Sequence, residues 1–325
     1  MDYTRLITIL IPAYNESASL PKLHSALSEL ADKLDKYRWE FLIVNDGSSD
    51  NTAETLEKLR ATDSRISYIN LSRNFGKEAA MLAGMDHAQG DAVVIMDADL
   101  QHPVSAIPRM IAEWEKGYDD VYGKRLSRGK EPWLRKKFSM LYYSLLQRNT
   151  KINILPNVGD FRLLDRKCLE AMKSLRETQR YTKGLFCWIG FKKCPVEYET
   201  NDRENGVSSF RFSNLLGLAM EGITGFTTSP LRIASVIGFI VSAIAFIYLI
   251  IVIAKTLFFG EPVQGYPTLL CVILILGGCQ LLTIGIIGEY IGRIFNETKH
   301  RMPYIVMDYK YSRFDKKTDI TGDPQ

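Results

Sequence analysis

The sequence predicts an α/β fold: a Rossmann-like, mostly parallel sheet with flanking helices, followed by a two-helix transmembrane hairpin. Two observations lead to this fold class. Apolar runs typical of buried strands alternate with helical patterns between residues 7 and 96. Two uncharged stretches of 22 and 21 residues follow, at Ile233–Ala254 and Thr268–Gly288. The composition, 46% hydrophobic and 24% charged, excludes a disordered or collagen-like chain.

The first part of the chain alternates strand and helix patterns. Strands are expected where short apolar runs occur, and helices where apolar residues recur every three or four positions. Ser17 or Ser19 is expected to cap the first helix. The expected order is strand Ile7–Tyr14, helix Leu20–Leu34, strand Glu40–Val44, helix Thr52–Arg60, strand Ile66–Leu71, helix Lys77–His87 and strand Val93–Met96. This alternation predicts parallel strands joined by right-handed crossovers.

The second part is interpreted as a membrane module. Each uncharged stretch is close to the roughly 20 residues needed to span a hydrocarbon core. The connector Phe259–Tyr266 carries no Lys or Arg, whereas Arg232 precedes the first stretch and Arg293 follows the second. Because basic residues favour the cytoplasmic side, both ends of the hairpin are expected to face the cytosol.

These patterns divide the chain into six expected segments. Residues 208–230 carry an apolar stripe that predicts an amphipathic interfacial helix, although a core-facing helix of the soluble domain fits the same stripe. Small residues in the second span would permit a homo-oligomer through the transmembrane helices. The segments are a soluble domain at 1–207, the interfacial helix at 208–230, a first span at 231–259, a connector at 260–266, a second span at 267–290 and a cytosolic C-terminal tail at 291–325.

Charge indicates the kind of partner. The 41 Lys and Arg residues exceed the 37 Asp and Glu residues by only four, and the basic residues are scattered. This is too small an excess to indicate nucleic acid, so no nucleic-acid partner is expected. Lipid headgroups of a membrane are the better-matched partner.

Polar clusters follow three of the expected strands, where ligands of parallel α/β sheets bind. Asp97 and Asp99 stand two apart at a strand end, and extended backbone would place both carboxylates on one side with Gln101 next in register. Such hard oxygen ligands suit Mg²⁺ or Mn²⁺. The sequence contains neither a G-x-G-x-x-G after a strand nor a phosphate-binding G-x-x-x-x-G-K-[ST] loop. A dinucleotide-dependent dehydrogenase and a P-loop enzyme are therefore disfavoured.

A basic segment, Gly123–Lys137, contains Arg125 and Arg135. It could close over the phosphates of a substrate and screen their repulsion, or it could be a solvated surface. His102 is likewise open to two interpretations, a contact with metal or sugar and a role at a helix start beside Pro103.

Five motifs together resemble an inverting family 2 glycosyltransferase with the GT-A fold, of the dolichol-phosphate mannose synthase type. The bacterial polyisoprenyl-phosphate (bactoprenol) glucosyltransferases are the most similar group. Thr227–Arg232 and Gly288–Arg293 also resemble that group's two-helix membrane module. The motifs are Ile11–Glu16, Asn45–Asp50, Arg73–Lys77, Asp97–Gln101 and Asn157–Arg162.

The resemblance implies roles for particular residues. Asp46 would receive the uracil edge, Asp97 would lie near the ribose and diphosphate, and Asp99 would act in catalysis as a metal ligand. Asp160 matches the position of a catalytic base. The nucleotide-sugar set is Pro12, Tyr14, Glu16, Asp46, Ser48 and Asp97; the metal set is Asp97, Asp99 and Gln101; the phosphate-binding set is Arg125, Arg135 and Arg203.

The resemblance further implies transfer of a hexose, with glucose favoured, from a UDP-sugar to undecaprenyl phosphate. The enzyme would lie in the bacterial cytoplasmic membrane with its catalytic domain and both termini cytosolic. UDP-N-acetylglucosamine or another sugar nucleotide is the alternative donor, and a non-enzymatic scaffold or flippase subunit is the rival of a different class. The acceptor is a phosphate monoester with a second pKa of about 6, so at pH 7 it is largely a dianion and needs little deprotonation. Asp160 is kept as the candidate base, and a role that only orients its neighbours is the alternative.

Overall fold

The computed structural model describes residues 5–126, 158–178, 180–199, 229–259 and 265–312. The chain forms two compact units. The first comprises residues 1–147, 152–211 and 302–325, and the second comprises residues 148–151 and 212–301. The expected interfacial helix at 208–230 lies almost wholly outside the described residues.

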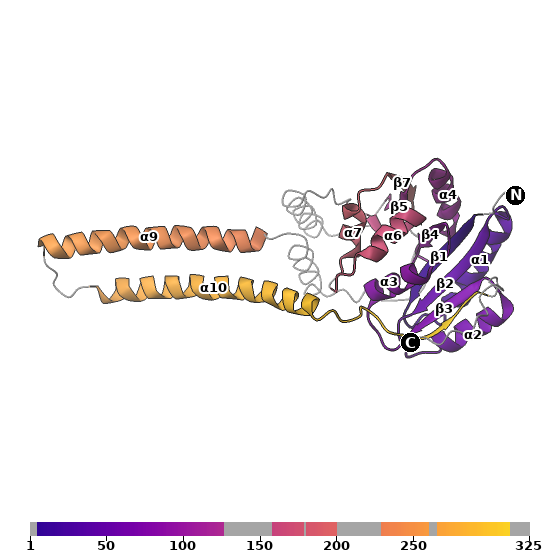
Figure 1. The fold of residues 1–325 in the computed structure, drawn as a ribbon, viewed down its shortest axis with the longest axis horizontal. Helices are drawn as coiled ribbons and strands as arrows, with labels where there is room; N and C mark the ends of the chain where they lie inside the picture. Colours follow the sequence, from indigo (N-terminus) through magenta and orange to yellow (C-terminus); the bar gives the residue numbers. More distant parts are fainter. Residues whose placement is uncertain (1–4, 127–157, 179, 200–228, 260–264, 313–325) are drawn as a thin grey trace. The chain divides into compact units, whose positions relative to one another are not determined.

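An eight-stranded sheet in the order β7-β5-β6-β4-β1-β2-β3-β8 forms the first unit (Figure 1). Its centre is the expected parallel set, β4-β1-β2-β3, in which β1 pairs with β2 along its whole length. The strands are β1 (Leu6–Ala13), β2 (Arg38–Asn45), β3 (Ile66–Leu71), β4 (Ala92–Ile95), β5 (Asp120–Arg125), β6 (Val158–Asp165), β7 (Lys193–Tyr198) and β8 (Val306–Lys310).

Antiparallel pairs extend the sheet on both sides, so it is mixed. β6 runs antiparallel to both β4 and β5, and β8 runs antiparallel to β3 at the opposite edge. Strand β8 comes from the segment that the sequence indicated only as a cytosolic tail. The Tyr304 hydroxyl donates to Asp86 at 2.6 Å beside it, and Arg60 donates to the Tyr311 carbonyl at 2.8 Å. Part of the tail is therefore the edge strand of the sheet.

Helices cover both faces of this sheet. On one face, α1 (Leu20–Lys33), α2 (Thr52–Thr62), the short η1 (Val104–Ala106) and α4 (Ile107–Glu115) contact one another or the sheet. Their apolar stripes meet buried residues such as Ile7, Ile9 and Phe41 in one core cluster. Ser19 stands at the start of α1, as expected, but its hydroxyl donates to Glu16 instead of accepting a helix N–H.

The opposite face carries α3 (Lys77–His87), α6 (Arg166–Ser174) and α7 (Thr182–Trp188). Helix α3 packs closely against β1 at Gly84, where a Cβ would lie 1.9 Å from the Leu10 side chain. Only a residue without a side chain permits this approach. The start of α3 is thereby held beside the carboxyl end of β1.

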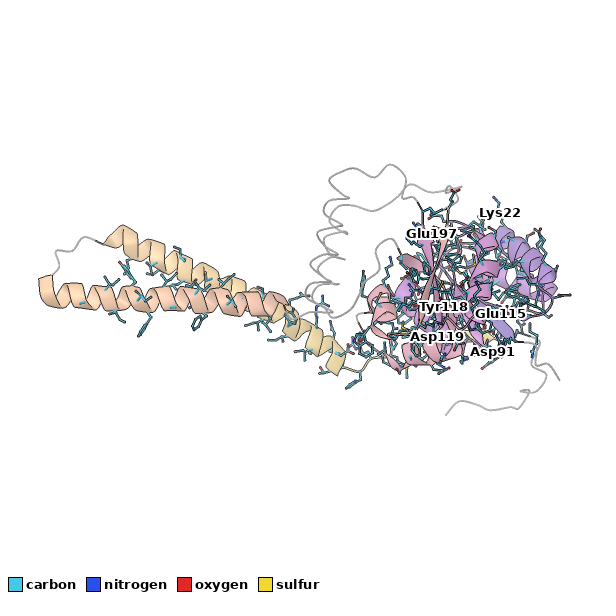
Figure 2. The ribbon with its side chains drawn as sticks, turned by 90° about the horizontal axis from the view of Figure 1, so that it is seen from above. Lys22, Asp91, Glu115, Tyr118, Asp119 and Glu197 are labelled. Atoms are coloured by element: carbon cyan, nitrogen blue, oxygen red, sulfur yellow. The ribbon has the colours of Figure 1, made fainter. Side chains whose placement is uncertain are left out.

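The second unit contains two long helices, α9 (Ser229–Phe259) and α10 (Tyr266–Thr298), which contact each other. Their large apolar side chains, including Phe239, Ile244 and Leu281, are exposed, and Figure 2 shows side chains projecting from both helices. Within the described residues, Ile275–Thr298 is long and apolar enough to cross a membrane, and Val236–Tyr248 is a shorter apolar stretch.

Candidate active site

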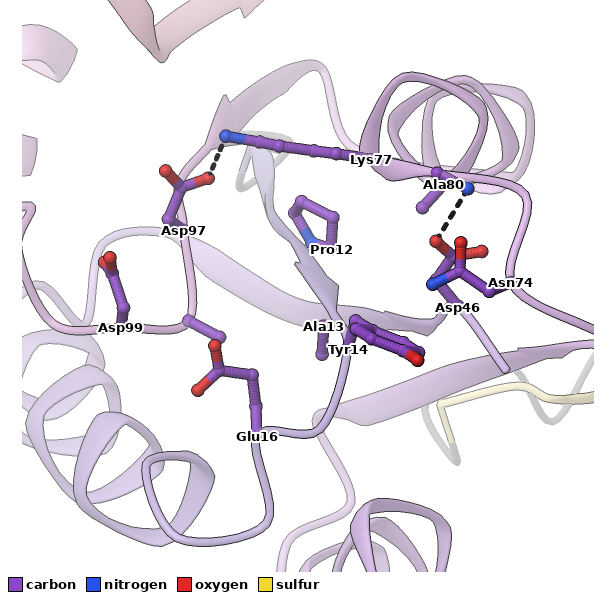
Figure 3. A pocket seen from close by; sticks show the side chains of 12 residues that line it. Pro12, Ala13, Tyr14, Glu16, Asp46, Asn74, Lys77, Ala80, Asp97 and Asp99 are labelled. Atoms are coloured by element: carbon purple, nitrogen blue, oxygen red, sulfur yellow. Dashed lines mark hydrogen bonds and ion pairs between the residues drawn. The ribbon is translucent and has the colours of Figure 1, made fainter. Parts of the chain in front are cut away.

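A cavity of about 290 Å³ opens at the carboxyl ends of β1, β2 and β4. The strand ends and the residues before α3 supply its walls (Figure 3). Six of the residues expected to bind the sugar nucleotide or metal line it: Pro12, Tyr14, Glu16, Asp46, Asp97 and Asp99. The topology thus brings together positions that are far apart in the sequence.

Asp46 fixes the loop that leads into α3. Its two carboxylate oxygens accept the backbone N–H groups of Phe75 at 2.7 Å and Gly76 at 2.9 Å. Burial raises the pKa of Asp46 above its ordinary value, and these two N–H groups only partly offset that rise. The next residue, Gly47, has φ +61° and lies so close to the Arg73 backbone that a Cβ would come within 2.3 Å. This turn therefore requires glycine.

Asp97 and Asp99 occupy the turn after β4. The Asp97 N–H donates to His102 Nδ1 at 3.1 Å, and the Gln101 N–H donates to Asp99 Oδ1 at 3.2 Å. His102 is buried and stacks on Phe161 at a centroid distance of 4.7 Å. Because Nδ1 accepts a hydrogen bond, the neutral ring carries its proton on Nε2. His102 therefore helps to hold the turn in place by accepting the Asp97 N–H.

Three carboxylates, Glu16, Asp97 and Asp99, line the same part of the cavity (Figure 3). Burial raises the pKa of Glu16, and the negative charges of Asp99 and Asp97 add to the rise even though a Ser19 hydrogen bond acts against it. Among the described residues, no three Asp, Glu, His or Cys side chains lie close enough to hold a metal ion by themselves. The carboxylates concentrate negative charge without forming a complete cage.

Lys77, at the start of α3, joins Asp97 to Asp160. Its Nζ lies 2.5 Å from Asp97 Oδ1 and 2.9 Å from Asp160 Oδ2. Partial removal from water acts to lower the pKa of Lys77, but the charges of Asp160 and Asp97 outweigh it and hold the pKa above its usual range.

Asp160 does not itself line the cavity, and the sheet register explains why it lies next to Asp97, which does. Arg162 of β6 pairs with Ile95 of antiparallel β4, so continuing the register by two residues puts Asp160 opposite Asp97. Asp160 is 9% exposed, and its Oδ1 is buried without a hydrogen-bond partner. Burial acts to raise the pKa of Asp160, but Lys77 and Lys183 lower it below its ordinary value. Asp160 is therefore held as a carboxylate.

The remaining expected residues lie around the cavity or outside the described part of the chain. Ser48 accepts the Asn15 N–H at 2.9 Å and thus joins two loops of the site. Gln101 follows the carboxylate turn but does not line the cavity. Arg125, at the end of β5, donates from Nε to the Tyr198 hydroxyl at 3.2 Å. Arg135 and Arg203 lie outside the described residues.

Sequence reasoning assigned no role to Lys77, Asn74 or Gly76, which also line the cavity. All three belong to the Arg73–Lys77 motif, so the motif marked the right segment. The helix Lys77–His87 was also predicted correctly, but its start was not connected with the site, where Lys77, the first helical residue, lies at the strand ends.

Comparison with known proteins decides the family. The family described as Glycosyl transferase family 2 matches residues 8–172, and the GtrB C-terminal hairpin matches residues 229–294. The chain belongs to glycosyltransferase family 2. Its mixed sheet with flanking helices is the GT-A fold of that family.

Relatives of this family 2 glycosyltransferase are similar over most of their length. The bactoprenol glucosyl transferase of Shigella phage SfV is 42% identical over 94% of this chain and 99% of its own. The prophage bactoprenol glucosyl transferase homolog of Escherichia coli (strain K12) is 41% identical with the same coverage. Glucosyl-3-phosphoglycerate synthase of Mycobacterium tuberculosis, solved with Mn²⁺ and UDP-glucose, gives a TM-score of 0.46 at 18% identity, covering 68% of this chain and 77% of that one.

Proposed function

We propose that this glycosyltransferase moves glucose from UDP-glucose to undecaprenyl phosphate, with inversion at the sugar's anomeric carbon. The observation that carries the proposal is the 42% identity to a bactoprenol glucosyl transferase across both the catalytic segment and the helical hairpin. The cavity supports it, because the carboxylates of Asp97 and Asp99 line its wall, where a divalent ion could join them to the diphosphate of a sugar nucleotide.

A divalent metal ion, Mg²⁺ or Mn²⁺, fits the donor set. The carboxylates of Asp97 and Asp99 are hard oxygen ligands, and the raised pKa of Glu16 reflects, after burial itself, the negative charge gathered beside them. An incomplete protein cage also fits, since Mg²⁺ is commonly held by one or two carboxylates together with substrate phosphates. Such an ion would neutralise charge on the departing diphosphate.

The residues of the chain would bind and orient the reactants. Tyr14, Asp46, Asp97 and Asp99 all line the cavity. We assign the nucleoside to Tyr14 and the Asp46 loop, and the diphosphate to Asp97 and Asp99. A phosphate oxygen of the lipid carrier attacks the anomeric carbon, and the bond from that carbon to the UDP oxygen breaks. The bonding electron pair leaves with UDP. Because the attacking phosphate is largely a dianion near pH 7, with a second pKa of about 6, no proton needs to be removed, and Asp160 would orient a reactant.

The helices α9 and α10 would form the membrane-spanning hairpin that brings the enzyme to its lipid acceptor. Their exposed apolar side chains and the match to the GtrB C-terminal hairpin support this assignment. The segments proposed from the sequence are a catalytic domain at 1–207, an interfacial helix at 208–230, spans at 231–259 and 267–290 and a tail at 291–325. Strand β8 of that tail belongs to the sheet of the catalytic domain. The carboxyl end of the chain would return to the cytosolic side.

A direct transfer assay tests the proposal. The purified full chain in lipid nanodiscs is incubated with undecaprenyl phosphate, Mg²⁺ or Mn²⁺, and one of a panel of UDP-sugars, and the lipid is analysed by mass spectrometry. We expect a mass increase of one hexose with UDP-glucose. A product only with UDP-N-acetylglucosamine would change the donor, and no lipid-linked sugar with any donor would refute the proposal.

A further inference from the structure

We infer that Lys77 is a positioning residue that places Asp160 for the reaction by bridging it to the carboxylate turn at Asp97. The inference rests on the proposed function for its kinetic part only. Its structural part concerns an ion-pair bridge that can be tested without any substrate.

The bridge joins side chains at the ends of two neighbouring antiparallel strands. Asp97 follows β4, whereas Asp160 belongs to β6, and 62 sequence positions separate the two residues. One ammonium group lies 2.5 Å from the first carboxylate and 2.9 Å from the second. Lys77 itself is fixed because α3 lies against β1 at Gly84. The position of Asp160 is therefore tied to the helix start and to the donor side of the cavity.

The charge balance shows why Asp160 depends on this bridge. Asp160 is 9% exposed, and a buried carboxylate without a cation is strongly unfavourable. Other charged or titratable groups also act on it from β6, α7, α3 and β7, but among the described residues only Lys77 forms an ion pair with it. The groups are Arg162 on β6, Lys183 on α7, Glu78 on α3 and Tyr198 on β7.

The arrangement of oxygens indicates a role in orientation. Lys77 holds Oδ2 of Asp160, while Oδ1 is buried and has no hydrogen-bond partner. A buried acceptor normally has a partner, and one left without it needs an explanation, of which a role in the reaction is one. Holding one oxygen also fixes the direction of the other, whose lone pairs no group in the described part of the chain uses. Asp160 can then act in one geometry.

The test is a double-mutant cycle with Lys77→Met, Asp160→Asn and the double variant. Lys77→Met keeps most of the length of the side chain and removes its charge, so Asp160 becomes a buried anion without its ion-pair partner. We expect Lys77→Met to lower the thermal unfolding midpoint, and Asp160→Asn added to it to recover part of that loss. Lys167→Met is the matched control, because it also removes an exposed lysine that is ion-paired with an aspartate, Asp119, away from the cavity.

The kinetic arm separates positioning from substrate binding. We expect Lys77→Met to lower kcat about a hundredfold, as small misplacements do, while the KM for UDP-glucose and the Kd for UDP stay within about threefold. The double variant should be no slower than Asp160→Asn alone. A tenfold or greater loss of affinity for UDP but not for UMP would instead mean that Lys77 binds the terminal phosphate directly.

Two outcomes would overturn the inference. One is a double variant no more stable than Lys77→Met, which would mean that Asp160 does not depend on the lysine charge. The other is additive kinetic losses, which would mean that the two residues act separately. Because the unfolding arm needs no substrate, its result is independent of whether glucose transfer itself is demonstrated.

Discussion

Asp46 accepts the backbone N–H of Phe75 at 2.7 Å, so a residue expected to meet the uracil base also holds the loop before α3. Its second oxygen accepts the N–H of Gly76, and that loop delivers Asn74 and Lys77 to the cavity. The shape of the nucleotide site therefore depends on a carboxylate at the end of β2. Any direct contact of Asp46 with the base would use the carboxylate lone pairs that these two N–H groups leave free.

Asp46→Asn tests this double role. The amide nitrogen would face one of the two N–H donors, so a charge-assisted hydrogen bond is lost; we expect a destabilisation of about 1.5–3 kcal/mol. UDP affinity should fall as the loop shifts. Denaturant unfolding and calorimetric UDP titration measure the two effects. Loss of UDP binding with unchanged stability would indicate that Asp46 serves the base alone.

Asp99→Asn tests the metal. The substitution keeps size and removes the negative charge, so turnover should fall on the order of 100-fold or more, with the fold intact. EDTA should abolish activity of the parent enzyme, and Mg²⁺ or Mn²⁺ should restore it. The control is Asp32→Asn. Asp32 is an exposed residue of α1, and its carboxylate pairs with Arg65. Near-normal turnover of the parent in EDTA would refute the metal requirement.

Asp160→Asn separates proton transfer from orientation. Burial acts to raise the pKa of Asp160, but Lys77 and Lys183 hold it below its ordinary value, so the carboxylate is ionised throughout the neutral range. An orienting carboxylate is needed at every such pH. We expect a loss of about a hundredfold at pH 7 that is not recovered at pH ~8.5. Recovery relative to the parent at high pH would return Asp160 to the role of base, and full activity at pH 7 would make it purely structural.

The central half of the sheet was predictable because its strands are short runs rich in apolar residues and because α1 has a clear three- and four-residue apolar period. That the residues after three of these strands lie together was predictable as well, since the carboxyl ends of parallel strands lie along the same edge of the sheet. The bridge from Lys77 to Asp160 was not predictable from local patterns, because it depends on the antiparallel register of β6 against β4. Strand β8 was missed for a related reason. Its pairing partner β3 lies more than 200 residues earlier, and its exposed face gives a weak apolar pattern.

The orientation of the hairpin is testable by cysteine labelling. In a variant without the native cysteines, Gln264→Cys should react with an impermeant reagent added outside intact cells, because the connector carries no basic residue. Gln264 lies outside the described residues. Lys310→Cys, on the edge strand of the catalytic sheet, should react only after the cells are opened. The reverse pattern would overturn the proposed topology.

Glu78 gives the last prediction, a pH dependence of stability. Burial, with the nearby negative charge of Asp160, raises the pKa of Glu78 to about 7, and the Thr182 hydroxyl donates to its carboxylate. In the unfolded chain the pKa of this carboxyl lies near its ordinary value of 4.5. Between these values the folded state holds more protons than the unfolded state, so stability is full at low pH and falls as pH rises toward 7.

Glu78→Gln removes this titration while keeping an acceptor for Thr182. At one pKa unit per 1.36 kcal/mol, the parent should lose roughly 3 kcal/mol relative to the variant between about pH 4.5 and pH 7. Denaturant unfolding of both proteins across pH 5–8.5 measures the difference. We expect the difference in unfolding free energy between Glu78→Gln and the parent to shift in favour of the variant as pH rises, and to level off above pH ~8. A difference that does not change with pH would mean that Glu78 is already ionised in the folded protein, with its negative charge compensated by the surrounding cations.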